Sequence, residues 1–377
     1  MSEPGTRRAF AHPGERDRVK PTRMAPQVQA ERPADPEVAF VDRLVQSASR
    51  AGVQADRASI VDFYVAVKSQ PLAVLIGARN TGKVALVKAL ASALTGSDPQ
   101  RRQSMIGHAW WAAGSGNVSL FTEAQSRFNA EKILSLIEEA RRPTNAHRVH
   151  IACLLRISPA ELSGLFTPLA LQFRQTRRAY LLAAELIEPV LFPANFLLIG
   201  TMDTAAPDWL LGDHGPNAVI LHRMKTEIGL SSVSPLIDSS PAEEFDFCKV
   251  CIHDERSACQ RLRQILGRDT QPLRPLLQIE ALLQHSGVRV GRSEYSQAVV
   301  YLANAWSANV AGLFERGARP NMRAAMDIAI ERMLLSYTGE ISLGPADLSQ
   351  ALRKVVGDDY PRAASVLDWL LRRLSSG

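Results

Sequence analysis

Residues 71–84 read Pro-Leu-Ala-Val-Leu-Ile-Gly-Ala-Arg-Asn-Thr-Gly-Lys-Val, and this stretch decides the fold. The apolar run Leu72–Gly77 is typical of a buried parallel strand, and Ala85–Leu94 is typical of a helix. The frame Gly-x-x-x-x-Gly-Lys lies between them, and in such a frame backbone N–H groups surround a phosphate at the amino end of the helix. The stretch therefore predicts a phosphate-binding loop between a strand and a helix.

The residues expected to bind a nucleotide are those of the loop: Gly77, Ala78, Arg79, Asn80, Thr81, Gly82, Lys83 and Val84. Lys83 is expected to reach the outer phosphates of ATP or GTP. The next position normally holds Ser or Thr, whose hydroxyl binds Mg²⁺. Val84 cannot do this, because a hard cation needs oxygen ligands. The alternative interpretation is a glycine-rich turn between a strand and a helix that exposes a lysine without binding phosphate.

The carboxylates of a hydrolytic site are also missing from their usual position. A P-loop enzyme that hydrolyses its nucleotide normally ends a later strand in Asp for Mg²⁺, often followed by a Glu that activates water. The candidate strand, residues 149–155, ends in Leu155 and is followed by Arg156. Neither side chain can replace the lost carboxylate. Glu161 lies further on, in Ser-Pro-Ala-Glu, a pattern that predicts a capping box at a helix start.

Strand-like runs alternate with helical ones around the loop, which predicts an α/β fold with a parallel sheet. Residues 196–200 form a further apolar run that ends in Thr-Met-Asp-Thr. Residues 218–221 and 226–230 are two more candidate strands, and His222 and Arg223 lie between them. A small hairpin is expected from residues 179–192.

The chain divides into three expected parts. Residues 1–37 contain six prolines and little apolar periodicity, so we expect a disordered tail. Residues 38–243 carry the α/β pattern. Beyond about residue 244 helical patterns dominate, and residues 244–377 are expected to form a helical domain.

The composition is that of a soluble globular protein, with 46% apolar and 22% charged residues. The net charge of +6 is spread along the chain, so it permits contact with nucleic acid without arguing for it. The longest apolar runs are too short to cross a bilayer, and the amino end lacks the apolar stretch of a signal peptide. We therefore expect a cytoplasmic protein without membrane contact. Four cysteines in 377 residues fit a reducing compartment.

Cys248, Cys251, His253 and Cys259 place four soft ligands within twelve residues. Their spacing matches none of the standard structural zinc sites, so ordinary thiols and no metal site are expected. A zinc-dependent nucleic-acid module is the alternative that these residues leave open.

Several segments, in order, resemble the McrB-type AAA+ NTPase domain. Residues 60–77 are similar to the start of that domain. Residues 192–203, Phe-Pro-Ala-Asn-Phe-Leu-Leu-Ile-Gly-Thr-Met-Asp, are similar to its sensor strand, with Asp203 in place of the usual Asn. Arg223 stands where the family carries an arginine pair before a strand, which makes it the candidate finger for a neighbour's nucleotide. Residues 325–339 and 360–370 resemble the lid segment and the helix after it.

This resemblance implies an AAA+ core with a helical lid that binds ATP or GTP. It also implies a homo- or hetero-oligomeric ring, an effector such as a nuclease, contact with nucleic acid through the assembly, and a role in restriction of foreign DNA. The departures from the family, Val84, Leu155, Arg156 and Asp203, concentrate at the chemistry. They favour a pseudo-NTPase that binds nucleotide without hydrolysing it. The alternatives are an active ATPase or GTPase with displaced carboxylates, such as Asp203 or Glu161, and a purely structural subunit without nucleotide.

Overall fold

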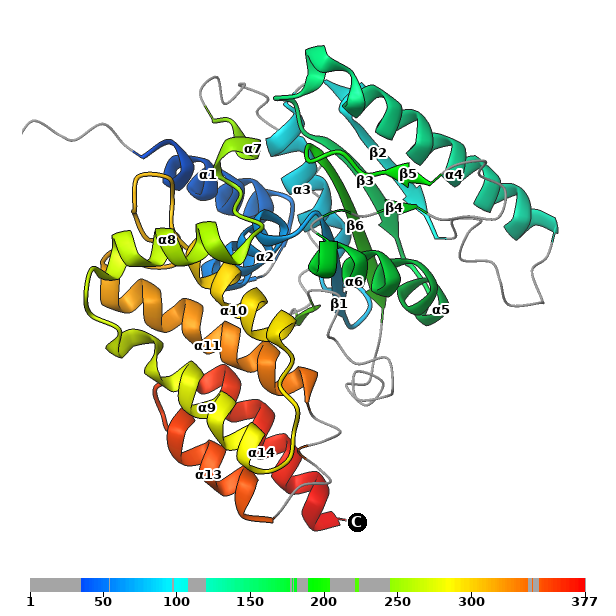
Figure 1. The fold of residues 1–377 in the computed structure, drawn as a ribbon. Coiled ribbons are helices and arrows are strands. Elements are labelled where there is room, and N and C mark those ends of the chain that lie inside the picture. The colour runs from blue at the N-terminus through cyan, green and yellow to red at the C-terminus, as the bar shows by residue number, and fades with distance from the viewer. Residues whose placement is uncertain are drawn as a thin grey trace, which may run out of the picture. The chain divides into compact units, whose positions relative to one another are not determined.

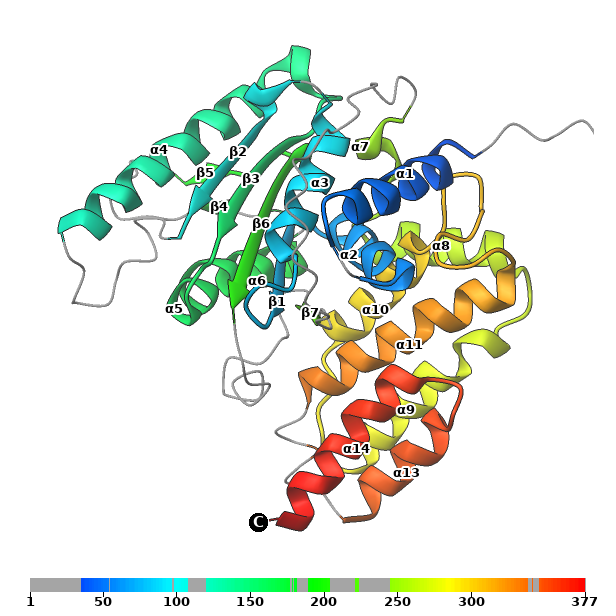
Figure 2. The ribbon, with the colours of Figure 1, turned by 180° about the vertical axis from the view of Figure 1, so that it is seen from behind.

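The centre of the fold is a parallel sheet with helices on both faces, as the computed structural model shows (Figure 1, Figure 2). The structure describes residues 35–53, 55–96, 98–107, 120–176, 178, 180–181, 189–203, 221–223, 245–337, 341 and 346–376. Within these ranges the sheet has five strands in the order β2-β3-β6-β1-β7. They are β1 (Leu72–Gly77), β2 (Arg102–Ile106), β3 (His150–Leu155), β6 (Phe196–Asp203) and β7 (Leu221–Arg223).

Helices precede, connect and follow these strands. In the first half of the chain they are α1 (Pro36–Arg50), α2 (Arg57–Ser69), α3 (Lys83–Thr95), α4 (Leu120–Arg141), α5 (Pro159–Glu161), a π-helical turn η4 (Leu162–Phe166) and α6 (Thr167–Thr176). Short 3₁₀ turns are η1 (Pro99–Arg101) and η3 (Pro143–Asn145). The predicted hairpin is confirmed as the antiparallel pair β4 (Tyr180–Leu181) and β5 (Val190–Leu191).

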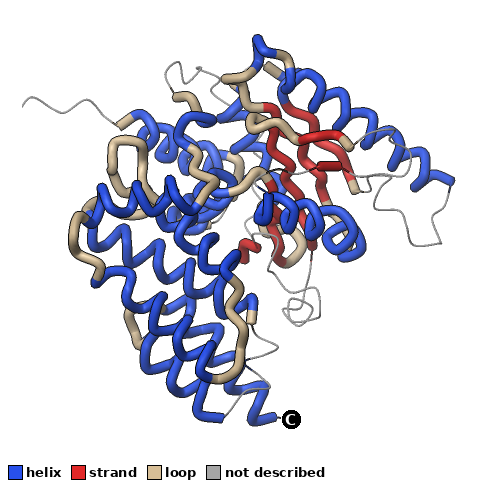
Figure 3. The backbone as a smooth tube through the Cα atoms, viewed as in Figure 1, coloured by secondary structure: helices blue, strands red, loops and turns tan. Residues whose placement is uncertain are grey.

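From residue 245 onward helices joined by loops dominate the described chain, as the tube view illustrates (Figure 3). Its elements are α7 (Phe247–Val250), α8 (Glu255–Leu266), η7 (Gln271–Leu273), α9 (Arg274–His285), α10 (Arg292–Asn304), α11 (Ala318–Ser336), α13 (Ala346–Val356) and α14 (Pro361–Ser376). Helix dominance in this part of the chain agrees with the prediction. The expected boundary at 243/244 lies outside the described residues, and residues 35–377 form one compact unit.

The two faces of the sheet bury two separate apolar cores. Leu72, Val74 and Ile76 of β1 belong to the core under α4 and α6, while Ala73 and Leu75 belong to the core under α3. Successive side chains of a strand point to opposite faces, so a strand covered on both faces must be apolar throughout. This explains why residues 72–77 form an unbroken apolar run, and the strand predicted there is confirmed.

Gly200 lies in the middle of β6, where the second core leaves no room for a side chain. A Cβ atom there would lie 2.9 Å from Phe166 Cζ and 3.1 Å from both Ile157 Cδ1 and Val74 Cγ2. We expect Gly200→Ala to lower the free energy of unfolding by about 1–3 kcal/mol, because an extra methyl in a packed core forces its neighbours apart. Urea denaturation measures this. The control is Gly164→Ala, since nothing lies within 4 Å of a Cβ at this exposed glycine, and equal losses in the two variants would contradict the packing argument.

Helix α1 begins earlier than the expected tail boundary at residue 37. The Asp35 side chain accepts hydrogen bonds from the N–H groups of Glu37 and Val38, and Pro36 occupies the first turn of the helix. Proline is favoured there because the first N–H groups of a helix have no partner within it. Pro36 therefore starts a helix instead of interrupting one. The rest of the expected tail, residues 1–34, lies outside the described residues.

No helix in the described ranges is long and apolar enough to cross a membrane. The longest, α4 (Leu120–Arg141), carries both acidic and basic side chains along its length.

Candidate functional site

The loop of residues 77–84 lies at the end of the sheet where the parallel strands have their carboxyl ends. In open sheets of this kind, ligands bind at the carboxyl ends of the strands. Strand β1 lies between β6 and β7, with Gly77 paired to Asp203 and Ile76 paired to Arg223. The sheet therefore brings two of the predicted site residues, far apart in the sequence, beside the start of the loop.

The backbone of the loop adopts the left-handed conformation twice. Asn80 has φ +64° and Gly82, which directly precedes α3, has φ +83°. Glycine and asparagine adopt positive φ at the lowest cost. Gly82 has no side chain with which to cap α3, so the N–H groups at the start of this helix face the loop without a side-chain cap. This is the arrangement that binds anions at a helix start.

The side chains of the loop differ in their exposure. Ala78, Arg79 and Asn80 are exposed, Gly77, Gly82 and Val84 are half-buried, and Thr81 and Lys83 are buried. The alternative interpretation expected an exposed lysine, and this part of it is wrong, since Lys83 is only 3% exposed.

The ammonium group of Lys83 is held inside the loop. Its Nζ donates hydrogen bonds to Gly77 O at 3.0 Å, Ala78 O at 2.6 Å and Thr81 Oγ1 at 3.1 Å. It also lies 2.9 Å from Asp203 Oδ1. Because an ammonium has three protons, these four oxygens satisfy it fully. Lys83 thus contacts protein oxygens at the place where it is expected to contact a phosphate.

Asp203 lies between two cations. Its Oδ2 is 3.9 Å from Arg79 Nε, while its Oδ1 contacts Lys83. Asp203 is the last residue of β6 and is 31% exposed, whereas the Arg79 side chain is 79% exposed. The sequence singled out Asp203 as a departure from the sensor pattern, but it gave no sign that this carboxylate pairs with Lys83. The pairing follows from the register of β1 against β6, and a single sequence does not show that register.

The positions that would hold Mg²⁺ carry hydrocarbon in the structure. Val84 packs against the core under α3, and Leu155 at the end of β3 is buried in the same core. Neither position supplies an oxygen. Arg156 follows with φ +59° and an exposed side chain, and its N–H donates to Thr201 Oγ1 at 2.9 Å. Asp203 is thus the carboxylate that the described structure brings to the loop lysine.

Glu161, the other candidate for a displaced carboxylate, caps a helix. Its Oε2 accepts a hydrogen bond from the Ser158 N–H at 2.8 Å, and the Glu161 N–H donates to Ser158 Oγ. The predicted capping box at the start of α5 is confirmed. The carboxylate stabilises the helix start, which explains its burial.

Arg223 occupies a position different from the expected one. The sequence placed it between two strands, but it is the last described residue of β7 and pairs with Ile76 of β1. Of the candidate strand at 218–221 only Leu221 is described, and it lies in β7; residues 218–220 and the candidate strand at 226–230 lie outside the described residues. The backbone of Arg223 is therefore at the sheet edge that carries the loop, and its role as a finger stays a prediction.

The cysteine cluster forms no metal centre in the described part of the chain, where no three His, Cys, Asp or Glu side chains are grouped suitably. Cys251 Sγ donates to Phe247 O at 3.1 Å, and burial raises the pKa of the Cys251 thiol well above its usual value. Burial also raises the pKa of Cys248 to about 11. The His253 ring packs edge-on against Phe173, with 5.4 Å between the centroids. The thiols of Cys248 and Cys251 therefore stay protonated at neutral pH.

No protein-family model matches this chain, and no curated protein sequence matches it.

Proposed function

We propose that this chain is a degenerate P-loop protein of the AAA+ type that binds a nucleoside polyphosphate without hydrolysing it. The observation that carries the proposal is the buried Lys83 at the carboxyl edge of a parallel sheet, enclosed by its loop and next to Asp203. The left-handed Gly82 and the uncapped start of α3 support it, because together they form an anion-binding backbone.

The roles of the residues follow from their chemistry. Backbone N–H groups of the loop and of α3 would hold the phosphates of ATP or GTP, and Lys83 would neutralise their charge. Val84 and Leu155 leave Mg²⁺ without the oxygens that it normally takes from these positions. Arg156 carries a positive charge and cannot activate a water molecule as a base. Binding is therefore retained in this proposal and hydrolysis is lost.

The ring, the effector and the defence role rest on the resemblance to McrB-type domains. In this view the chain joins a homo- or hetero-oligomeric ring and regulates an effector such as a nuclease. Arg223 would act on the nucleotide of a neighbouring subunit, because an arginine finger needs only its own charge and reach. Such a subunit contributes to turnover in the ring without hydrolysing its own nucleotide.

Titration with fluorescent ATP and GTP, with and without Mg²⁺, tests the proposal beside a phosphate-release assay on the same protein. We expect dissociation constants that change less than about threefold with Mg²⁺, and no phosphate release. Lys83→Ala is expected to weaken binding by roughly tenfold or more, which corresponds to about 1.4 kcal/mol. Lys88→Ala is the control, because Lys88 is an exposed lysine of the same helix. An absence of binding in every condition would leave only the structural-subunit alternative.

A working ATPase or GTPase is the second candidate, and the position of Asp203 favours it. The carboxylate lies at the loop lysine and is partly exposed, so it is the group best placed to ligate a metal there. Phosphate release that depends on Mg²⁺ and disappears in Lys83→Ala would establish this enzyme and overturn the pseudo-NTPase.

A further inference from the structure

The carboxylate of Asp203 contacts the same cations that an incoming phosphate needs. Lys83 lies 2.9 Å from one of its oxygens and Arg79 lies 3.9 Å from the other. We propose that Asp203 is an internal competitor of the ligand: its carboxylate neutralises Lys83 and has to leave before a polyphosphate can bind. This inference rests on the proposed function, since it concerns the same loop.

The burial of the two partners shows which of them can yield. Lys83 is 3% exposed and is enclosed by the Gly77 and Ala78 carbonyls and the Thr81 hydroxyl. Asp203 is 31% exposed at the very end of β6, so water can solvate its carboxylate once the ion pair is broken. Displacement of Asp203 therefore leaves the loop intact, whereas displacement of Lys83 would break its three hydrogen bonds to the loop.

The charges define the class of ligand that can compete. Lys83, Arg79 and Asp203 together carry a charge of about +1, and the carboxylate cancels much of the attraction that two cations would exert. A ligand must therefore supply more negative charge than the carboxylate that it displaces. A triphosphate chain does so over several oxygens at once, while a single phosphate offers little advantage. The structure thus points to triphosphates, free or as nucleotides, over monophosphates.

The opposite role for Asp203, as a ligand of Mg²⁺, predicts an effect of opposite sign. If the carboxylate competes with the ligand, removal of its charge strengthens binding whether or not Mg²⁺ is present. If the carboxylate holds the metal, removal of its charge weakens the binding that depends on Mg²⁺. Asp203→Asn distinguishes the two roles, since asparagine has nearly the same shape without the charge.

The test is a calorimetric titration of the full chain with inorganic triphosphate, and with ATP, in the presence and in the absence of Mg²⁺. We expect Asp203→Asn to bind triphosphate roughly tenfold more tightly than the wild type, because a carboxylate beside the phosphates repels them. Asp42→Asn is the matched control: Asp42 is 44% exposed and pairs with Arg57 at 2.6 Å, so the variant changes the net charge equally without removing a partner of Lys83 or Arg79. The control is expected to stay within twofold of the wild type.

Each outcome bears on one of the two proposals. If the wild type binds clearly and Asp203→Asn binds equally well or more weakly, the proposed competition by Asp203 is overturned. The proposed nucleotide binding is then unaffected. If only Asp203→Asn binds tightly, the proposed competition by Asp203 is supported. The wild-type loop then does not admit the ligand, and nucleotide binding is removed from the proposed function. No binding by either protein, with thermal melting that shows both to be folded, would overturn both proposals.

Discussion

Replacement of Lys68 by Met is expected to lower the free energy of unfolding by about 3–5 kcal/mol, because it leaves a buried carboxylate without its cation. The Lys68 side chain is 1% exposed and that of Glu37 is 2% exposed, and 2.6 Å separates Nζ from Oε1. Burial of an unpaired charge is among the most costly changes that a core can suffer. Urea denaturation gives the value directly.

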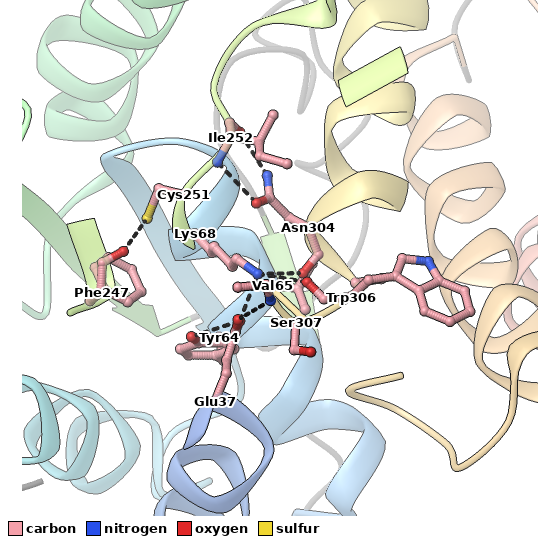
Figure 4. A network of polar contacts seen from close by, with 12 residues as sticks. Glu37, Tyr64, Val65, Lys68, Phe247, Cys251, Ile252, Asn304, Trp306 and Ser307 are labelled. Carbon is pink, nitrogen blue, oxygen red and sulfur yellow. Dashed lines mark hydrogen bonds and ion pairs between the residues drawn. The ribbon is translucent and has the colours of Figure 1, made fainter. Parts of the chain in front are cut away.

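The ion pair is part of a larger polar network, so its loss should weaken contacts between several parts of the chain (Figure 4). Lys68 Nζ also donates to Trp306 O at 2.8 Å, and the Tyr64 hydroxyl donates to Glu37 Oε1 at 3.1 Å. The N–H of Ala308 donates to the other oxygen of Glu37 at 3.2 Å. The network therefore joins α1, α2 and the segment after α10, three parts that are distant in the sequence.

Lys249→Met is the control for this prediction, because Lys249 pairs with Asp246 at 3.1 Å but is 72% exposed. Exposed ion pairs contribute about 0–1 kcal/mol, so this variant should be nearly as stable as the wild type. The double variant Glu37→Gln with Lys68→Met should recover part of the loss, since it removes both buried charges. A loss in Lys68→Met no larger than that in Lys249→Met would contradict the expected cost of the buried charge.

Asp62→Ala is expected to cost a similar amount, about 3–5 kcal/mol, because it removes the shared acceptor of three groups. Asp62 is buried in α2. Its Oδ1 accepts a hydrogen bond from the Tyr301 hydroxyl at 2.8 Å and pairs with Arg332, and its Oδ2 lies 3.7 Å from Arg362 Nη1. The variant would leave two guanidinium groups and a hydroxyl without this acceptor.

The readouts for Asp62→Ala are urea denaturation and limited proteolysis. Because the three partners come from α10, α11 and α14, faster cleavage within residues 292–376 is expected along with the loss of stability. Asp359→Ala is the control, since Asp359 pairs with Arg323 at 2.6 Å but is 71% exposed. Wild-type stability and cleavage in Asp62→Ala would show that α2 does not hold these helices through Asp62.

Local patterns predicted the elements around the loop well. The strand at 72–77, the helix after the loop and the capping box at Ser158 all follow from signals within a few residues, and all are confirmed. Strand β2 was missed, because Arg102, Gln103 and Ser104 give it little apolar character. In the described part of the sheet it lies at an edge, where polar side chains are tolerated and favoured.

The contacts that define the candidate site could not be predicted in the same way. Lys83 and Asp203 meet because β1 pairs with β6, and Lys68 meets Glu37 because α1 packs on α2. Both pairings depend on tertiary structure. The sequence identified Asp203 as unusual and Lys83 as the loop cation, yet their attraction to each other emerges only when the sheet order is known. Arg223 was expected after a strand that ends at Leu221, whereas β7 continues through it.

The order of the strands has a consequence for the newly made chain. Strand β1 is synthesised first, but its neighbours come much later: Leu72 pairs with Leu198, and Val74 pairs with Leu221. Ribosomes add roughly 5–20 residues per second, so the wait is on the order of ten seconds. During that time an apolar strand and both of its edges have no native partner. The loop with its lysine thus leaves the ribosome well before Asp203 and Arg223, the residues of β6 and β7 that pair with the end of β1 in the folded sheet.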